Sequence, residues 1–194
     1  LRFLRDGGLL CAQNVTAVGF IGGTVPDDED VRDSIIEFPT SDVSNAGIAV
    51  GMALSGKRVI QVVRYQGFFH FNAPAWSCYA AKAASGYEME CPLLIRALCM
   101  EGAIGGTGSS HHGMAMRMPG LKVRAPMTPA EWEDCFSEWM TDTVPMLISE
   151  NRKSLSIESG DDRPGFWEWN GPRKRDICLL PVGGARLSVT REMV

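Results

Sequence analysis

Short apolar runs alternate with amphipathic or small-residue segments along most of this chain. The pattern predicts a strand at the start of residues 9–18, and further strands over residues 35–38, 58–63, 93–99, 121–124, 146–149 and 177–182. Residues 58–63 and 93–99 are almost continuously apolar, which indicates strands buried on both faces. We therefore expect a sheet that is covered on both sides.

Three helices are predicted between these strands. One covers residues 45–55 and ends before Gly56, a residue type favoured just past a helix end. A second covers residues 73–85, with Pro74 tolerated in its first turn. The third follows Thr128, a suitable N-cap, and continues to about residue 141. Strands alternating with helices of this length predict an α/β fold with a doubly wound, mostly parallel sheet.

Glycine-rich and polar segments divide the chain. Residues 19–23 and 102–113 are predicted loops. We expect one domain over residues 1–155, a linker over residues 156–175, and the truncated start of a second α/β domain over residues 176–194. The chain begins at a leucine and stops inside a helix-like segment, which suggests a fragment of a longer protein.

Composition narrows the functional classes. The 194 residues are 45% hydrophobic and 22% charged, with a formal net charge of −4, so the chain shows no basic footprint for nucleic acid or an anionic membrane. No apolar run approaches the roughly 20 residues of a membrane span, and a cytoplasmic protein is expected. The six cysteines include no Cys-x-x-Cys pair, which favours scattered reduced thiols over a disulfide framework.

A lone carboxylate precedes the most unusual helix of the chain. Asp42 lies just ahead of the predicted helix over residues 45–55, which is dense in alanine and glycine. Small residues allow another backbone or a flat ligand to approach closely. The strand over residues 58–63 follows, and then a group of aromatics that includes Phe68. At such a position an aspartate is either an N-cap or exposed loop acid, or a chemical group, and spacing alone leaves both open.

The segment resembles the pyrimidine-binding domain of thiamine-diphosphate enzymes, in particular the beta subunit of the first component of 2-oxo acid dehydrogenases. Aligning Gly47 and Gly51 with the helix glycines of that family places the family's catalytic glutamate on Asp42. The same register places Phe68 on the aromatic residue that packs against the pyrimidine. The resemblance spans about residues 9–155 and continues in order through Ala80-Ala-Lys82, Pro92-Leu-Leu-Ile-Arg96, Pro119-Gly-Leu-Lys-Val123, Ala125-Pro-Met-Thr-Pro129 and Pro145-Met-Leu-Ile-Ser-Glu150.

The resemblance implies roles for three residues toward the cofactor. Asp42 would bind a ring nitrogen of the aminopyrimidine and so favour the tautomer that deprotonates the thiazolium. Its side chain is one methylene shorter than the family's glutamate. Phe68 would offer a flat apolar face to the same ring. Gln13, with Asn14, falls where the family often has an acidic pair near the cofactor, so that pair's charges are missing here.

Two adjacent histidines are the remaining catalytic candidates. His111 and His112 end the loop over residues 102–113, and the family implies a histidine here that faces substrate. The order Ser-His-x-Gly is similar to the Thr-His-x-Gly of the transketolase branch, which favours His111, with His112 second. A surface pair is the plain alternative. Adjacent histidines point apart and no cysteine or carboxylate stands at zinc spacing, so no metal ligands are expected.

The motif by which the resembled family binds the diphosphate of the cofactor is missing from this sequence. The family binds Mg²⁺ and diphosphate through Gly-Asp-Gly…Asn. Here Gly160-Asp-Asp162 lacks the third glycine and Asn170 follows too soon. The resemblance therefore implies thiamine diphosphate whose Mg²⁺ is held by an alpha-type partner subunit, together with a second copy of this chain and a lipoyl or acyl carrier domain.

Two functions from different classes follow. The first is a beta-type subunit of a split thiamine-diphosphate enzyme, either a 2-oxo acid dehydrogenase component or transketolase-like. It would cleave a 2-oxo acid or ketose phosphate and pass the acyl or ketol two-carbon unit to an acceptor. The alternative is a non-catalytic binding module that keeps the fold and partner interface without turnover. A generic α/β domain binding another ligand leaves the ordered motifs unexplained.

Overall fold

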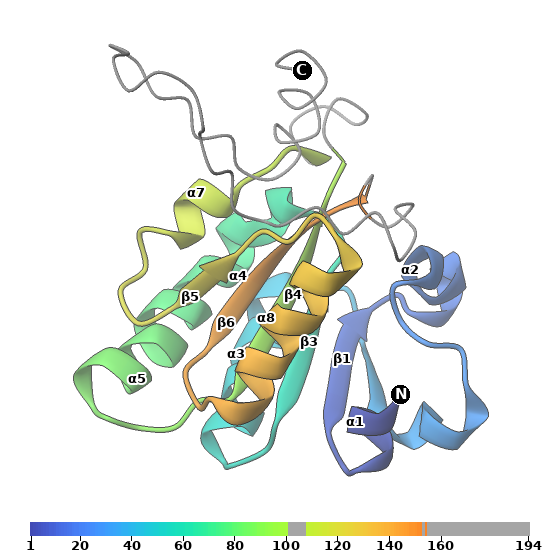
Figure 1. The fold of residues 1–194 in the computed structure, drawn as a ribbon, viewed down its shortest axis with the longest axis horizontal. Coiled ribbons are helices and arrows are strands. Elements are labelled where there is room, and N and C mark those ends of the chain that lie inside the picture. The colour runs from blue at the N-terminus through green and yellow to red at the C-terminus, as the bar shows by residue number, and fades with distance from the viewer. Residues whose placement is uncertain (101–107, 153, 155–194) are drawn as a thin grey trace.

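The computed structural model describes residues 1–100, 108–152 and 154, and within them a single six-stranded sheet dominates (Figure 1). All of its strand pairs are parallel, in the order β2-β1-β3-β4-β6-β5. The strands are β1 (Leu9–Gln13), β2 (Ile35–Phe38), β3 (Val59–Val63), β4 (Leu93–Cys99), β5 (Lys122–Arg124) and β6 (Met146–Asn151). The predicted strand over residues 177–182, the linker and the start of a second domain lie outside the described residues.

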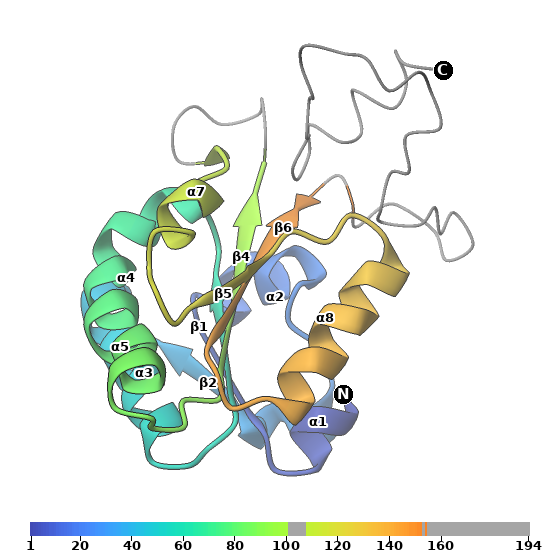
Figure 2. The ribbon, with the colours of Figure 1, turned by 60° about the vertical axis from the view of Figure 1, so that its left-hand side comes forward.

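Helices cover both faces of the sheet, as Figure 2 shows. One face carries α3 (Asp42–Leu54), α7 (His112–Ala115), and a continuous helix made of α4 (Phe69–Ala75), the π-helical segment η4 (Trp76–Ala81) and α5 (Lys82–Gly86). The other face carries α1 (Arg2–Arg5) and α8 (Pro129–Thr141). The doubly wound α/β fold expected from the sequence is confirmed.

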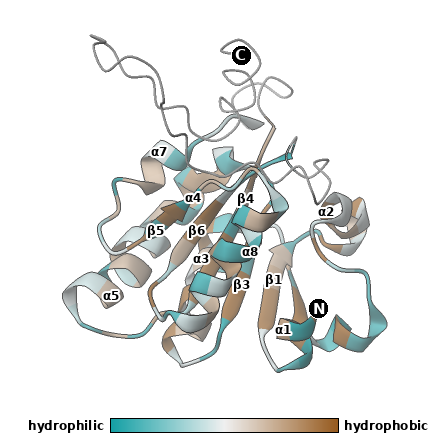
Figure 3. Ribbon diagram, in the orientation of Figure 1, coloured by the Kyte–Doolittle hydropathy of each residue, from teal (hydrophilic) through white to brown (hydrophobic). Residues whose placement is uncertain are grey.

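The core forms two apolar layers, one on each side of the sheet. Strand residues alternate between the layers: Val59 and Val63 pack under α3, and Ile60 and Val62 pack on the opposite side. Every residue of β3 is buried, as its continuous apolar run predicts. The strands β1, β3 and β4 are accordingly mostly hydrophobic, whereas α8 alternates between hydrophilic and hydrophobic residues (Figure 3).

Two predicted helices begin earlier than expected. Helix α3 starts at Asp42 and not at residue 45, so this carboxylate lies in the first helical turn, where the helix dipole favours it. The second helix starts at Phe69, which places Pro74 inside α4 and not in its first turn. Proline cannot donate a helical hydrogen bond, and the π-helical segment begins two residues after Pro74, at Trp76. The helix after Thr128 is confirmed, with the Thr128 hydroxyl accepting from the Glu131 amide at 3.2 Å.

The predicted loop over residues 19–23 is instead a short left-handed helical turn, α2 (Gly19–Gly23). Phe20 and Ile21 adopt φ angles of 51° and 54°, which are unfavourable for residues with a Cβ atom. Ile21 is buried in the core layer under α8, and this packing offsets the backbone strain. Two short 3₁₀ helices, η1 (Thr16–Val18) and η2 (Glu29–Ser34), flank the turn.

Candidate functional site

The candidate site lies at the carboxyl ends of β1, β2 and β3. The chain passes from β1 to β2 on one side and then crosses to β3 on the other side of β1. Ligands of open parallel sheets bind at such switch points, because the loops that leave the two strands diverge there. A cavity of about 170 Å³ opens at this place, and we name it the Asp42 cavity; its lining includes Gln13, Asp42, Asn45, Arg64, Phe68 and Asn72.

Asp42 is half-buried and is held by amides. Its Oδ1 accepts a hydrogen bond from Gln13 Nε2 at 2.8 Å and a longer one from Asn72 Nδ2 at 3.4 Å. No hydrogen bond and no ion pair from the described part of the chain reaches Oδ2. One carboxylate oxygen is therefore fixed while the other keeps its full capacity as an acceptor.

Phe68 and Gln13 lie at the same cavity. Phe68 ends the 3₁₀ turn η3 (Gln66–Phe68), its ring is half-buried, and its centroid is 6.2 Å from that of Tyr65. Gln13 ends β1 and reaches across to Asp42 on α3. The structure thus brings together the three residues for which the sequence predicted cofactor contacts, although they come from different elements.

The two histidines do not line this cavity. The His112 ring lies beside Ser110 and Ser149, with Nδ1 at 2.5 Å and 3.4 Å from their hydroxyl oxygens. His111 donates its backbone N–H to Gln66 Oε1 at 2.7 Å, and its ring packs edge-on against His70 with centroids 5.8 Å apart. Of the predicted loop over residues 102–113, residues 102–107 lie outside the described residues, and the last two residues, His112 and Gly113, form the start of α7 instead of loop.

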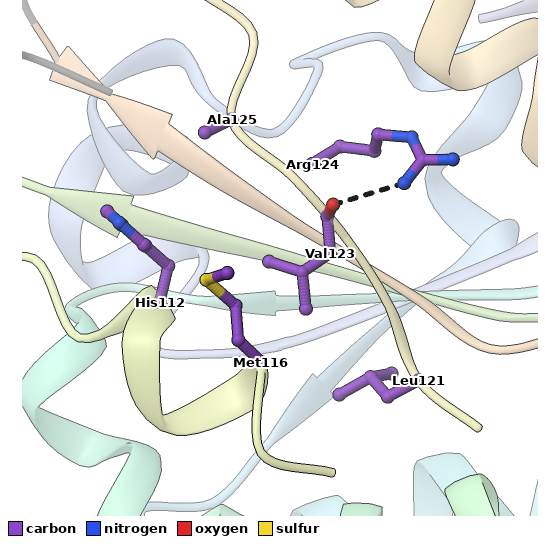
Figure 4. A pocket seen from close by; sticks show the side chains of 6 residues that line it. All are labelled: His112, Met116, Leu121, Val123, Arg124 and Ala125. Carbon is purple, nitrogen blue, oxygen red and sulfur yellow. Dashed lines mark hydrogen bonds between the residues drawn. The ribbon is translucent and has the colours of Figure 1, made fainter. Parts of the chain in front are cut away.

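His112 borders a second cavity of about 310 Å³, the His112 cavity, between α7 and β5 (Figure 4). Its walls are mostly apolar, with Met116 and Val123 pointing toward each other in the figure. Arg124 lies at its far side, where Glu138 binds the guanidinium through bonds of 2.8 Å and 3.0 Å. The cavity therefore offers an apolar wall and one imidazole, and its arginine is already neutralised.

Buried amides are the site residues that the sequence analysis missed. Gln61, Gln66 and Asn72 are 3%, 0% and 1% exposed, and all three form side-chain hydrogen bonds. Gln66 Nε2 donates to the Ala97 carbonyl at 3.0 Å and to Ser149 Oγ at 2.7 Å, which ties η3 to β4 and β6. A glutamine in the middle of the apolar run Val59–Val63 was the available signal, since buried polar side chains require partners.

Three cysteines and the possible metal ligands of the described residues supply no competing site. Burial raises the pKa of Cys11 to about 12 and the pKa values of Cys91 and Cys135 to about 11, which suppresses thiolate chemistry. Among the described residues, no group of three His, Cys, Asp or Glu side chains is arranged to hold a metal ion.

Within the part of the chain that the structure describes, no helix combines the length and the apolar character needed to cross a membrane.

Comparison with known proteins gives related beta subunits. The chain is 25% identical over 161 residues to the 2-oxoisovalerate dehydrogenase subunit beta of Bacillus subtilis, a match that covers 79% of this chain and 45% of that protein. It is 28% identical over 167 residues to the acetoin:2,6-dichlorophenolindophenol oxidoreductase subunit beta of Cupriavidus necator, covering 78% of this chain and 47% of the relative. The human mitochondrial pyruvate dehydrogenase E1 component subunit beta is 26% identical over 162 residues, covering 79% of this chain and 42% of the relative. The chain thus spans less than half the length of each of these relatives.

A solved structure supports the fold, and a family model identifies the family. A split gene transketolase, solved as an inactive beta4 tetramer, superimposes with a TM-score of 0.59 at 13% identity, over 78% of this chain and 48% of that one, which supports the fold. The model of the transketolase pyrimidine-binding domain matches residues 18–157, well over half of the chain. The chain therefore belongs to the family of transketolase pyrimidine-binding domains.

Proposed function

We propose that this chain is the pyrimidine-binding, beta-type part of a split thiamine-diphosphate enzyme. The enzyme would cleave a 2-oxo acid or a ketose phosphate beside its carbonyl and transfer the acyl or ketol two-carbon unit to a lipoyl or carrier-protein acceptor. Family membership and beta-subunit relatives support this class. The observation that carries the proposal is the Asp42 cavity, in which a carboxylate with one unbonded oxygen and an aromatic side chain line the same space.

The residues of this cavity fit an aminopyrimidine. Asp42 Oδ2 is a free acceptor for a ring nitrogen that carries a proton. Phe68 offers an apolar face for a flat ring. Asn45 also lines the cavity, and its buried Oδ1 finds no donor among the described residues, although its Nδ2 donates to the Pro39 carbonyl at 2.8 Å. An orphaned buried acceptor is costly, and an exocyclic amino group has the chemistry to satisfy it.

Each residue has a distinct task in this proposal. Asp42 holds a proton at the ring nitrogen, while Gln13 and Asn72 fix the carboxylate from the other side. Phe68 orients the ring and excludes water from one face. His111 is proposed as the group that exchanges a proton with the reacting substrate, with His112 as the second choice. The cofactor, when bound, supplies the carbon nucleophile that attacks the substrate carbonyl.

The diphosphate and Mg²⁺ are proposed to be held by an alpha-type partner, which would complete the site across an interface. The helical face beside Asp42 supports this. Residues 43–56 and 65–81 contain no Asp, Glu, Lys or Arg. Large apolar side chains are nevertheless exposed there, namely Val43, Ile48, Phe71 and Tyr79. Uncharged surface of this kind is typical of protein interfaces. A second copy of this chain and a lipoyl or carrier domain are further proposed partners.

Thiamine-diphosphate binding by the assembled pair is the central test. This chain would be co-expressed with a companion that carries Gly-Asp-Gly…Asn, and binding would be measured by calorimetry in the presence of Mg²⁺. The pair should bind thiamine diphosphate, and the chain alone should bind it negligibly because the metal ligands belong to the partner. Micromolar binding by the isolated chain would contradict a split site.

A surface variant separates assembly from binding. Ile48→Lys places a charge in the uncharged face of α3 and should prevent the pair from co-purifying. Met140→Lys is the matched control, because Met140 is an exposed apolar residue on α8, across the sheet. Equal co-purification of the two variants would place the partner elsewhere. A pair that assembles and binds the cofactor, yet turns over neither a 2-oxo acid nor a ketose phosphate, would favour the binding-module alternative.

A further inference from the structure

A chain of side-chain hydrogen bonds leads from the core to Asp42. Trp76 Nε1 donates to Gln61 Oε1 at 3.0 Å, and Gln61 Nε2 donates to Asn72 Oδ1 at 3.1 Å. Asn72 Nδ2 then donates to the Phe68 carbonyl at 2.9 Å and to Asp42 Oδ1 at 3.4 Å. Trp76 is fully buried, and Gln61 and Asn72 are nearly so, so these groups have little access to water as an alternative partner.

The direction of this chain is fixed at both ends. An indole nitrogen can only donate, so the carbonyl end of Gln61 must face Trp76 and its amide NH₂ must face Asn72. This in turn points the NH₂ of Asn72 toward Asp42 and Phe68. The Phe68 carbonyl can only accept, which agrees with the same assignment. Reversing either amide would oppose two acceptors or two donors in a buried space.

We infer that Asn72, oriented by Gln61 and Trp76, is a positioning residue for the proposed pyrimidine site. It holds the two residues that would contact the pyrimidine, Asp42 and Phe68. Its single NH₂ group binds the carboxylate of Asp42 and the backbone of Phe68, and so couples the acid on α3 to the aromatic residue that directly precedes α4. The inference rests on the proposed function of Asp42, and adds a residue to which neither the motifs nor the comparisons assign a role.

The short side chain of Asp42 explains why a positioning residue is needed. An aspartate reaches one methylene less far than the glutamate of the resembled family, so its placement depends more on what holds it. Asn72 and Gln13 both bind Oδ1, which leaves the other oxygen of this cavity-lining residue unbonded. Displacement of a reacting group by about 1 Å can cost about 10²-fold in rate. Asn72 acts by preventing such displacement, and it exchanges no proton itself.

A double-mutant cycle tests this role in the assembled pair. Thiamine-diphosphate affinity is measured by calorimetry with Mg²⁺ for wild type, Asn72→Leu, Asp42→Ala and the double variant. Leucine is close to asparagine in size and removes both amide groups. Ile60→Val is the matched control, because Ile60 neighbours Gln61 on β3 but faces the opposite core layer. Exchange of the cofactor's C2 proton is followed by NMR as a second measurement.

A positioning role predicts strong coupling between the two sites. Asn72→Leu should weaken cofactor affinity by about tenfold when Asp42 is present, which corresponds to loss of one buried hydrogen-bonding partner. It should have less than about a twofold effect in the Asp42→Ala background, because no carboxylate remains to be positioned. C2 proton exchange should fall by about 10²-fold in the single variant. Ile60→Val should change neither quantity.

A purely structural role predicts another pattern. If Asn72 only satisfied its buried neighbours, the loss of affinity would be equal in both backgrounds, and the inference would be wrong. Unchanged affinity and exchange in Asn72→Leu would also overturn it. If Asn72→Leu does not fold, the cycle is repeated with Trp76→Phe, which removes only the donor that orients Gln61. This variant should weaken cofactor binding by about threefold when Asp42 is present and should have little effect in the Asp42→Ala background. Equal losses of affinity in the two backgrounds would overturn the inference. A wild-type pair that fails to bind the cofactor would refute the proposed function itself.

Discussion

Two carboxylates near the carboxyl edge of the sheet, Asp42 and Glu150, are held in opposite ways. Glu150, on β6, is 1% exposed and binds Arg96 through two bonds, of 2.5 Å and 3.1 Å. That guanidinium also donates to the Thr24 carbonyl and lies over the Trp132 ring, 4.9 Å from its centroid. Asp42 is half-buried, and amides rather than a cation hold it.

The difference separates a structural carboxylate from one that remains available to a ligand. Both oxygens of Glu150 are occupied and its charge is balanced within the protein, as a buried charge requires. Asp42 has one oxygen occupied, and within the described residues no cation forms an ion pair with it, although Arg64 lines the same cavity. Its charge is therefore left to interact with a cationic or protonated group that enters the cavity. The predictions below test this contrast.

The largest effect is expected at Asp42. Asp42→Asn should abolish activation of the cofactor, because a neutral amide does not stabilise a proton on the ring nitrogen. The fold should be unaffected, since no cation loses its partner. Asp42→Glu should be tolerated, or even faster, if the cavity accommodates the extra methylene. C2 proton exchange in the assembled pair, with circular dichroism for the fold, checks both variants. Full exchange in Asp42→Asn would mean that another group activates the cofactor.

The second-largest effect, on turnover, is expected at one of the two adjacent histidines. If His111 faces the substrate, His111→Ala should slow turnover by about 10²–10⁴-fold, the range for a lost acid–base group, and leave cofactor affinity almost unchanged. His112→Ala should be mild, because the two adjacent rings have different surroundings, His70 for one and two serines for the other. Steady-state kinetics on the pair decides between them. The reverse order would identify His112 as the active residue, and two silent variants would make the segment structural.

At Glu150 the expected effect is on stability. Glu150→Gln leaves Arg96, whose side chain is only 16% exposed, without its counter-charge, and should lower the free energy of unfolding by about 3–5 kcal/mol. Denaturant unfolding measures it. Replacing both partners, Arg96→Met with Glu150→Met, should cost less than the single change, because no charge is left unpaired. A loss below about 1 kcal/mol in Glu150→Gln would mean that the pair is not structural.

The smallest effect is expected at two further carboxylates, Glu138 and Asp142, which are only partly buried. Hydrogen bonds from Lys122 lower the pKa values of Asp142 and Glu138, and the same bonds raise the pKa of Lys122. The depressed carboxyl pKa values stabilise the fold at neutral pH, and this contribution is lost as pH falls through them, below the ordinary 3.8 and 4.5. The raised lysine pKa adds stability that is lost only above the ordinary 10.5.

Lys122→Met tests the pH range over which these ion pairs stabilise the fold. Solvent screens these groups, so the variant should lose no more than about 1 kcal/mol at pH 7, measured by urea unfolding. The difference from wild type should shrink toward both acid and alkaline pH. A difference that stays constant across the range would show that packing of the lysine stem, and not its charge, is responsible.

Much of the fold was predictable because burial imposes its own pattern. Residues 93–99 were predicted as a strand and form β4 with the same bounds, since a strand between two helical layers must be apolar on both faces. The turn of α2 was missed. Positive φ angles at Phe20 and Ile21 oppose local preference, and only the buried contacts of Ile21 offset them. The early start of α4 was missed because Pro74 was expected in a first turn.

The candidate site was only partly predictable. The motif register placed Asp42, Gln13 and Phe68 together, and the structure brings all three to one cavity. Asn72, the second amide that binds Asp42, has no such signal, because asparagine at this position looks like any polar residue of a helix. The placement of His111 and His112 relative to a substrate stays a prediction, since neither lines the Asp42 cavity.

The sequence by itself determined the layered α/β fold and the family, because apolar periodicity and an ordered set of motifs are properties of the chain read in one dimension. Only the tertiary structure decided which carboxylate is neutralised and which is left open. That distinction depends on whether a cation or an amide lies within hydrogen-bonding distance, and the partners of Asp42 and Glu150 come from elements 29 to 54 residues away. Folding brings these partners together. The Trp76 indole, which can only donate, fixes the direction of the hydrogen bonds that lead through Gln61 and Asn72 to Asp42.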